Sequence, residues 1–419
     1  MTILQRLRQL KPRLLILLAV VGPGIITANV DNDAGGITTY SVSGAHFGYT
    51  LLWIMPLLIV ALIIVQEMSA RLGVVTGKGL AALLRETLGL RVTTLVLGLL
   101  VLVNLTNTIS EFAGVAASME IFGISKYISV PVVAILVWVL IVKANYRTVE
   151  RVFLVASAVY LAYIASGIMA NPEWSEVGRA LVTPSFKFEG GFIVMAVTII
   201  GTTIAPWMQF YQQSAIVDKG IPVAHYGYAR LDVIIGSVFA IVIASFITVA
   251  CAATLFHNGV RIETAKDAAL SLAPLAGRYA STLFALGLLN ASVFAAAILP
   301  LCTAYTVCEA FGFESSVSRQ WKQAPIFFGI YTAMIFIGAV FVLLPLKSLV
   351  QVMMFSQTLN GLLLPFILIV MLRLVNDKRQ MGSYANNRFL NIVSWLTVGL
   401  LIGLTLLLVL VTIAPRLLG

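Results

Sequence analysis

Charged residues are scarce in this sequence, at 11% of 419 positions, whereas hydrophobic residues make up 60% and the mean hydropathy is +1.00. A water-soluble domain could not bury so much apolar surface, so soluble enzymes and binding modules are excluded. Apolar runs of roughly 20 residues recur along the chain, each long enough to cross a hydrocarbon core about 30 Å thick as a helix. Period-two alternation is missing, which excludes a β-barrel. The composition therefore predicts an all-α membrane protein.

Cysteine and histidine are also rare, with three residues of each. All three cysteines lie in apolar runs, so neither a disulfide scaffold nor a Cys-rich metal site is predicted; they are Cys251, Cys302 and Cys308. The histidines fall at the ends of predicted spans or in loops, so the usual proton carrier is missing from mid-membrane; they are His46, His225 and His257. Hydrolase motifs such as Gly-x-Ser-x-Gly are absent, and we expect neither an enzyme nor a resident cofactor.

The net charge of +10 arises from short segments between the apolar runs. Placing the N-terminus inside puts 19 of the 27 Lys and Arg residues on inside segments, as the positive-inside rule requires. Membrane topology thus explains the charge, and no nucleic-acid partner is predicted. The basic start leads into a long helix without a cleavage site, so we expect no cleaved signal peptide.

We predict eleven spans, at roughly 14–46, 49–71, 92–120, 128–143, 150–170, 190–217, 228–256, 279–309, 325–343, 347–372 and 390–413. This division gives a cytoplasmic N-terminus (1–13), a first repeat of five helices (14–170), an outer loop (171–189), a second repeat (190–372), an inner loop (373–389) and an eleventh helix (390–413).

The first and sixth spans are interrupted where an ordinary span would be rich in leucine. The first reads GPGIITANVDNDAGGITTY and the sixth TIIGTTIAPWMQFYQQS, with Gly, Pro and polar residues at mid-depth. Two breaks five spans apart are typical of an inverted repeat whose unwound helices meet at a substrate site and work by alternating access.

Unwinding a helix in lipid frees backbone carbonyls, and such breaks survive where a ligand or water pairs with them. A carboxylate at the same depth usually marks an ion path. Asp33 is therefore our first candidate ligand, followed by Asp31. Both could instead cap the next half-helix, and the two roles could coexist. An amino-acid substrate would want the positive end of a half-helix, which fixed aspartates disfavour.

Further candidates lie around the two breaks. Plausible partners of a cation are the backbone carbonyl of Asn29 or Val30 at the first break and that of Thr203, Ile204 or Ala205 at the second. Four side-chain amides are also candidates: Gln209, Gln212, Gln357 and Asn360. The last two are three residues apart and share one helix face. Each amide could equally join helices together. Trp207, next to Pro206, could gate the cavity or pack in the core.

The motifs at these positions resemble those of the NRAMP family of divalent-metal transporters. They are GPG followed by D-x-G-x, FGYTLLW, SARLGVVTG, IAPWMQFYQQSAIV, SLAPLAG and FSQTLNGLLLPF. The resemblance implies the LeuT-type fold, with a 5+5 inverted repeat, an eleventh helix, and helices 1 and 6 broken.

The sequence differs from the family motifs at positions that bind the metal or carry protons. The family's first break supplies an Asp and an Asn, and this chain has Asp33 but Gly36 at the Asn position. The family's Met-Pro-His motif corresponds here to Ala205, Pro206 and Trp207, so the thioether is gone. A second family His falls at Gln212.

The third helix also has fewer acidic residues that could carry protons than the family motif has. The family has an Asp-x-x-Glu pair there, which becomes Thr108 with Glu111. Glu67 with Arg71 is interpreted as a local ion pair, and Asp232 beside Arg230 is likewise interpreted as structural. Glu111 alone could begin a proton path.

This pattern resembles the NRAMP-related magnesium transporter branch, and the ligand chemistry agrees. A thioether selects softer metals, whereas carboxylate, carbonyl and water suit Mg²⁺ and Mn²⁺. Mg²⁺ sheds its waters reluctantly, so a roomy site near Asp33 should take a largely hydrated ion. We predict import of Mg²⁺ and Mn²⁺ without proton coupling; the alternative is a proton-coupled Mn²⁺/Fe²⁺ transporter. The expected partners are the ion and the bilayer, in a monomer in a prokaryotic cell membrane with its N-terminus in the cytoplasm.

Overall fold

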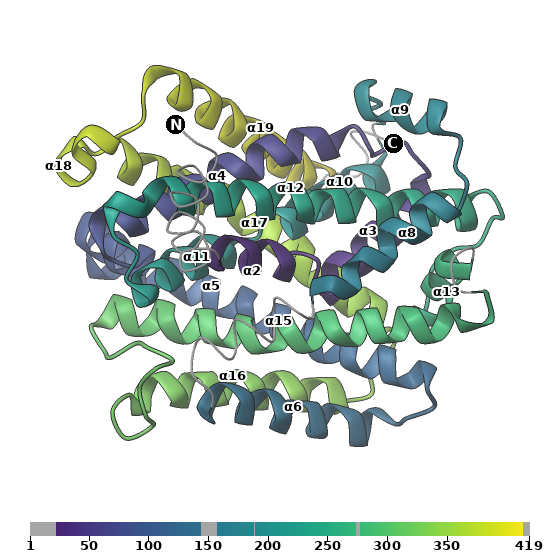
Figure 1. The fold of residues 1–419 in the computed structure, drawn as a ribbon, viewed down its shortest axis with the longest axis horizontal. Helices are drawn as coiled ribbons and strands as arrows, with labels where there is room; N and C mark the ends of the chain where they lie inside the picture. Colours follow the sequence, from purple (N-terminus) through teal and green to yellow (C-terminus); the bar gives the residue numbers. More distant parts are fainter. Residues whose placement is uncertain (1–21, 144–156, 188, 274–276, 414–419) are drawn as a thin grey trace, which may run out of the picture.

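The computed structural model describes all residues except 1–21, 144–156, 188, 274–276 and 414–419. Most of the long helices run along the longest axis of the molecule (Figure 1). Among the described residues, nine helical segments are long and apolar enough to cross a membrane. They correspond to predicted spans two to four and six to eleven. The beginnings of the first and fifth predicted spans lie outside the described residues, as does the predicted N-terminal segment 1–13. The described part of the first span consists of two short helices.

The helices have the following bounds: α2 Pro23–Val30, α3 Ala34–Phe47, α4 Ile54–Thr76, α5 Leu80–Ile121, α6 Lys126–Lys143, α8 Leu161–Met169, α9 Trp174–Val182, α10 Gly190–Thr203, α11 Pro206–Lys219, α12 Tyr226–Cys251, α13 Ala265–Ala269, α15 Ala280–Phe311, α16 Pro325–Leu343, α17 Leu349–Asn376, α18 Lys378–Met381 and α19 Arg388–Ile413. A π-helical turn, Ala252–Phe256, continues α12.

One difference from the expected spans concerns α5, which begins before the predicted start at residue 92. Its first part ends at Gly89, whose φ of +75° is a left-handed conformation that favours glycine. The helix therefore kinks there, and the apolar part beyond the kink matches the predicted third span. The short helices α9 and α13 lie in loops between spans, where hydropathy gives no signal.

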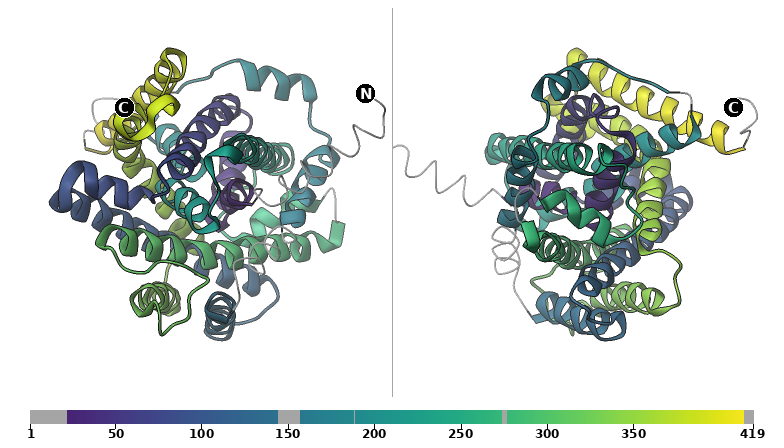
Figure 2. Two further views of the ribbon diagram at one scale, coloured as in Figure 1. Left: turned by 60° about the vertical axis from the view of Figure 1, so that its left-hand side comes forward. Right: turned by 90° about the vertical axis from the view of Figure 1, so that its right-hand side faces the viewer.

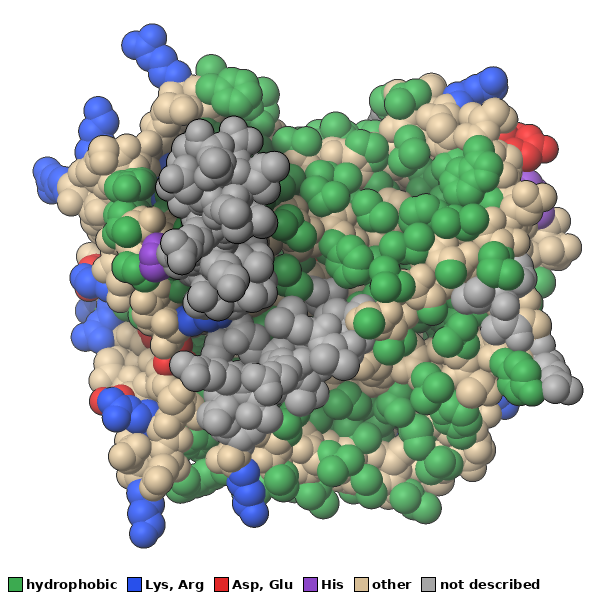
Figure 3. Space-filling view, viewed as in Figure 1, with side chains coloured by type: hydrophobic (Ala, Val, Ile, Leu, Met, Phe, Trp, Pro, Cys, Tyr) green, Lys and Arg blue, Asp and Glu red, His purple; other side chains and the backbone are tan. Residues whose placement is uncertain are grey.

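The two halves of the first span occupy the middle of the bundle. The end-on view in Figure 2 shows α2 and α3 surrounded by the other helices. Both pack along α12, while α5 and α15 pack together on another side and α6 with α16 forms an outer layer. Large apolar side chains outside this core face outward, for example Leu95, Ile135 and Phe336. Figure 3 shows such side chains over the middle of one face, with many of the visible Lys and Arg at its left-hand end. This distribution fits a bilayer around the middle of the bundle.

Candidate metal-binding site

The first break lies where predicted, in the turn Asp31–Asp33 between α2 and α3. Asp33 is the N-cap of α3, and its Oδ1 accepts a hydrogen bond from the backbone N–H of Gly36 at 2.6 Å. This bond satisfies one of the amides that a helix start leaves free. Asp33 is only 3% exposed, and burying a carboxylate at this depth in a membrane costs free energy. Capping leaves its other oxygen for a second role.

Two further carboxylates approach this turn. Asp31 is buried, and neither of its oxygens has a hydrogen-bond partner in the described structure. Glu111 on α5 accepts a hydrogen bond from the N–H of Ala34 at 3.1 Å. Its other oxygen, Oε1, is buried and has no hydrogen-bond partner in the described structure. Unpaired acidic oxygens at this depth are stabilised by a bound cation or by a proton.

The second break separates α10 from α11 at Ile204 and Ala205, and Pro206 occupies the first turn of α11. The amide of Gln209 folds back onto this break, with its nitrogen 2.8 Å from the carbonyl oxygen of Ala205 and 2.7 Å from that of Pro206. In this orientation the amide nitrogen donates to both carbonyl oxygens, and the carbonyl groups freed by the break are thereby paired. Gln209 and Ala205, two of the candidates named from the sequence, therefore lie next to each other.

The two breaks meet through small and hydroxyl residues. The hydroxyl groups of Tyr40 and Thr203 are 2.8 Å apart. A Cβ on Gly36 would lie 2.5 Å from the carbonyl oxygen of Asp31 and 3.3 Å from Oγ1 of Thr202. Thr202 is buried and its hydroxyl has no hydrogen-bond partner in the described structure. It belongs to the candidate site, although a threonine in an apolar run gave no signal in the sequence.

Helix α17 supplies the amides expected from its sequence. The Nε2 atom of Gln357 lies 3.5 Å from Oδ1 of Asp33, and Asn360 donates to Oε1 of Gln357 at 2.8 Å. Asn360 and Asn107 exchange two hydrogen bonds of 2.9 and 3.1 Å between α17 and α5. A chain of amides thus leads away from Asp33. The bonds between Asn360 and Asn107 also join α17 to α5, which is the helix-joining role expected for such amides.

The structure places other candidates outside this constellation. Gln212 accepts a hydrogen bond from Thr27 of α2 at 2.8 Å, so its oxygen faces that half-helix. Thr108 donates to the carbonyl of Asn104, and its methyl group faces Gly338 on α16.

Two cavity candidates remain from the sequence. Trp207 is 1% exposed, and its ring packs at a tilt against Tyr211, with centroids 6.4 Å apart, which is a core contact. Asn29 lies in α2, but its side chain is outside the described residues. Trp207 is therefore placed as core packing in this conformation.

Of the two charged pairs expected to be structural, one forms as expected and the other does not. Arg71 does form the expected ion pair with Glu67, at 3.2 Å. Asp232 instead faces α2, accepting hydrogen bonds from the backbone N–H groups of Gly22, Gly24 and Ile25 at 2.7 to 3.3 Å. It is structural, as expected, but it caps a half-helix rather than balancing its neighbour Arg230.

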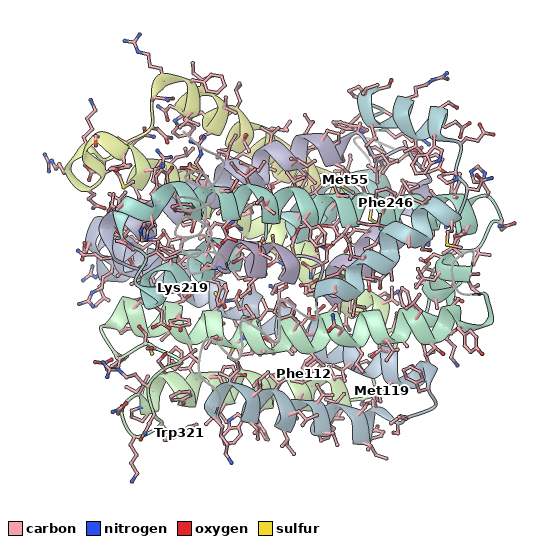
Figure 4. All side chains as sticks on the ribbon, viewed as in Figure 1. Met55, Phe112, Met119, Lys219, Phe246 and Trp321 are labelled. Atoms are coloured by element: carbon pink, nitrogen blue, oxygen red, sulfur yellow. The ribbon has the colours of Figure 1, made fainter. Side chains whose placement is uncertain are left out.

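A cavity of about 1160 Å³ opens at one end of the bundle. Its walls come from the ends of α3 and α5 and the starts of α10 and α17, and its titratable lining includes His46, Glu120, Glu263 and Lys347. Figure 4 marks this end near Met119 and the opposite end at Lys219. Thr38 contacts the sulfur of Met353 at 3.5 Å, one turn beyond Asp33 on the cavity side. Asp33 itself is not among the residues that line the cavity.

Among the described residues, no three His, Cys, Asp or Glu side chains gather closely enough to hold a metal by themselves. A cation at the breaks would therefore rely on one or two carboxylates together with carbonyl, amide and hydroxyl oxygens and water. Such donors suit a hard divalent ion that keeps part of its hydration shell.

The bundle of spanning helices with two breaks defines a membrane transporter, and comparison with solved structures confirms the fold. A manganese transporter from Eremococcus coleocola superposes with a TM-score of 0.79 at 23% identity, covering 94% of this chain and 86% of that one. Mhp1, a nucleobase-cation-symport transporter, superposes with a TM-score of 0.56 at 14% identity, covering 95% of this chain and 92% of that one. The fold is the predicted LeuT type.

The sequence comparisons then give the family. Residues 24–411 match the family model described as natural resistance-associated macrophage protein-like, so the chain belongs to the Nramp family. A divalent metal cation transporter from Yersinia pestis is 27% identical, covering 94% of this chain and 95% of that protein. One from Bradyrhizobium diazoefficiens is 29% identical, with 93% and 88% covered. The chain is accordingly a transporter and not an enzyme.

Proposed function

We propose that this Nramp transporter imports divalent cations by alternating access, with largely hydrated Mg²⁺ as its preferred ion and Mn²⁺ as a second substrate. Its relatives are divalent metal and manganese transporters, which supports the class of substrate. The observation that carries the ion preference is Asp33, capping α3 in an unwound segment, with Ala205 at the position where the resembled motif has a methionine. Oxygen donors without a thioether favour hard ions.

The amide chain supports transport without proton coupling. Gln357, Asn360 and Asn107 occupy the route from Asp33 towards α5, and amides neither take up nor release protons at physiological pH. Inward movement of two charges is favoured by about 4.6 kcal/mol at 100 mV, from roughly 2.3 kcal/mol per charge. The membrane potential is thus a sufficient driving force.

One observation favours the alternative, a proton-coupled Mn²⁺ transporter. Glu111 is bonded to the N–H of Ala34, the residue after Asp33, and its other oxygen is unpaired. Two buried carboxyl groups so close in space are more stable when one of them holds a proton, and a cation arriving at Asp33 would displace that proton. Release of that proton into the cavity would not by itself make a proton-coupled transporter. Coupling also requires a second titratable group that carries the proton to the other side of the membrane.

A flux assay separates these functions. Full-length protein in liposomes containing a Mg²⁺-sensitive and a pH-sensitive dye should show Mg²⁺ and Mn²⁺ influx under an inside-negative potential without acidification. Acidification that depends on the metal and disappears in Glu111→Gln would establish the coupled alternative. Glu86→Gln is a matched control, because Glu86 is an exposed acid on the same helix, paired with Lys78. Absence of both Mg²⁺ and Mn²⁺ influx would reject the proposal altogether.

We further propose a monomer in the bacterial cell membrane, with its N-terminus and the α11 end of the bundle in the cytoplasm. The charge asymmetry of the loops supports this orientation. A cysteine substituted for Lys347, a residue of the cavity lining, should then react in intact cells with a thiol reagent that does not cross membranes. A cysteine at Lys322 should react only after permeabilisation, and the reverse pattern would reject this orientation.

A further inference from the structure

A second group of unpaired oxygens lies at the end of α11, away from the two breaks. Glu309 on α15 has its Oε2 atom shielded from solvent and without a hydrogen-bond partner in the described structure. Its carboxylate lies directly against Gly79, the residue before α5, where even a Cβ would overlap it. A carboxylate held in this way, at the inner end of a spanning helix, needs a proton or a cation for stability.

Two adjacent residues of α11, which packs against α15, also carry unpaired oxygens. The hydroxyl of Ser214 has no hydrogen-bond partner among the described residues. Gln213 uses its nitrogen to donate to the carbonyl of Lys78 at 2.8 Å, next to Gly79, and its oxygen is left unpaired. Both side chains are at most 1% exposed. Buried polar atoms are normally paired, so three such oxygens on these neighbouring segments indicate a missing partner.

The neighbouring charge is negative, which favours a positive partner. Asp218, one turn beyond Ser214 on α11, accepts a hydrogen bond of 2.7 Å from Tyr305, one turn before Glu309 on α15. Two cations of the adjoining loop and of α5 bind other groups. Lys78 pairs with Glu86 at 2.7 Å, and Arg85 donates to the carbonyl of Ala310 at 2.8 Å.

We propose that Glu309, Gln213 and Ser214, with Asp218 behind them, form a second cation site for a divalent metal on its way out of the transporter. The donors are carboxylate, amide and hydroxyl oxygens, which are ligands for hard divalent ions. The nine residues from Ala205 to Ser214 along α11 correspond to roughly 14 Å at 1.5 Å per residue, so this site is separate from the one at Asp33. It lies towards the end of the bundle opposite the cavity.

The test is the number of Mn²⁺ ions bound by the full-length protein in detergent, from the electron paramagnetic resonance signal of the free ion. The wild type should bind two ions, Asp33→Ala one, Glu309→Gln one and the double variant none. Glu86→Gln, which removes an exposed acid at the same end, should still bind two. Ser214→Ala should weaken the second ion about tenfold, and this variant serves if Glu309→Gln fails to fold.

The two proposals fail in different ways in this experiment. A wild type that binds a single ion, or a Glu309→Gln variant that keeps both, overturns the second site. Two ions in the wild type and two in Asp33→Ala would leave the second site in place and reject the proposed site at the breaks.

Discussion

Asp232 on α12 accepts a hydrogen bond of 2.7 Å from the backbone N–H of Gly24, and this contact joins the start of the half-helix α2 to a neighbouring span. The approach is close, because a Cβ on Gly236, one turn further along α12, would lie 2.7 Å from the carbonyl oxygen of Gly24. The cavity opens at the other end of the bundle. An ion leaving past α2 therefore requires α2 to move away from α12.

Replacing Asp232 by alanine should release α2. Loss of an N-cap costs about 1 to 2 kcal/mol, which raises the undocked population of α2 roughly 5- to 30-fold. A cysteine introduced at Thr27, which bonds to Gln212 in this structure, should then react faster with a thiol reagent by a similar factor. Glu263→Gln, in the cavity at the other end, should leave the rate unchanged, and an unaltered rate in Asp232→Ala would show that the cap does not hold α2.

Gly36 should tolerate no side chain. A Cβ there would lie 2.5 Å from the carbonyl oxygen of Asp31, a backbone atom that cannot move without changing the turn. We expect Gly36→Ala to lower Mn²⁺ uptake in liposomes more than tenfold. Gly191→Ala is the control, because a Cβ at this position in α10 meets nothing within 4 Å. Uptake near the wild-type rate in Gly36→Ala would mean that the turn is not part of the ion site.

An acid in place of Gln357 should create a pH dependence. In Gln357→Glu, an additional carboxylate next to Asp33 would share a proton with it, and that proton would compete with the metal. Mn²⁺ uptake by this variant should fall as the pH falls, more steeply than in the wild type. The measurement is the initial rate of Mn²⁺ uptake at pH values from about 8 to about 5. Gln323→Glu, in an exposed loop, is the control. Identical profiles in the two variants would place Gln357 away from the ion.

A thioether at the second break should change the ion preference. Ala205 precedes Pro206 at the start of α11, and Ala205→Met would add a soft ligand there. Cd²⁺ should then compete with Mn²⁺ about tenfold more strongly than in the wild type. Ala205→Leu controls for side-chain volume. Equal competition in the methionine and leucine variants would contradict the position assigned to Ala205.

Much of the fold was predictable because its signals are local. The length of apolar runs defined the spans, and Gly, Pro and Asp at mid-depth located both breaks to within a few residues. The partner of Asp232 was not predictable, because the amides it caps lie about 210 positions away and carry no side-chain signal. Thr202 and Glu309 were missed for a related reason. A single hydroxyl in an apolar run, or an acid near a span end, acquires meaning only from its neighbours in space.

The most direct test of the central claim is Mg²⁺ influx into liposomes by the wild type and by Asp33→Ala under an inside-negative potential. The account predicts a robust wild-type flux and a loss of at least tenfold in the variant, which removes the buried carboxylate at the break. A folded Asp33→Ala protein that carries Mg²⁺ at the wild-type rate would contradict it.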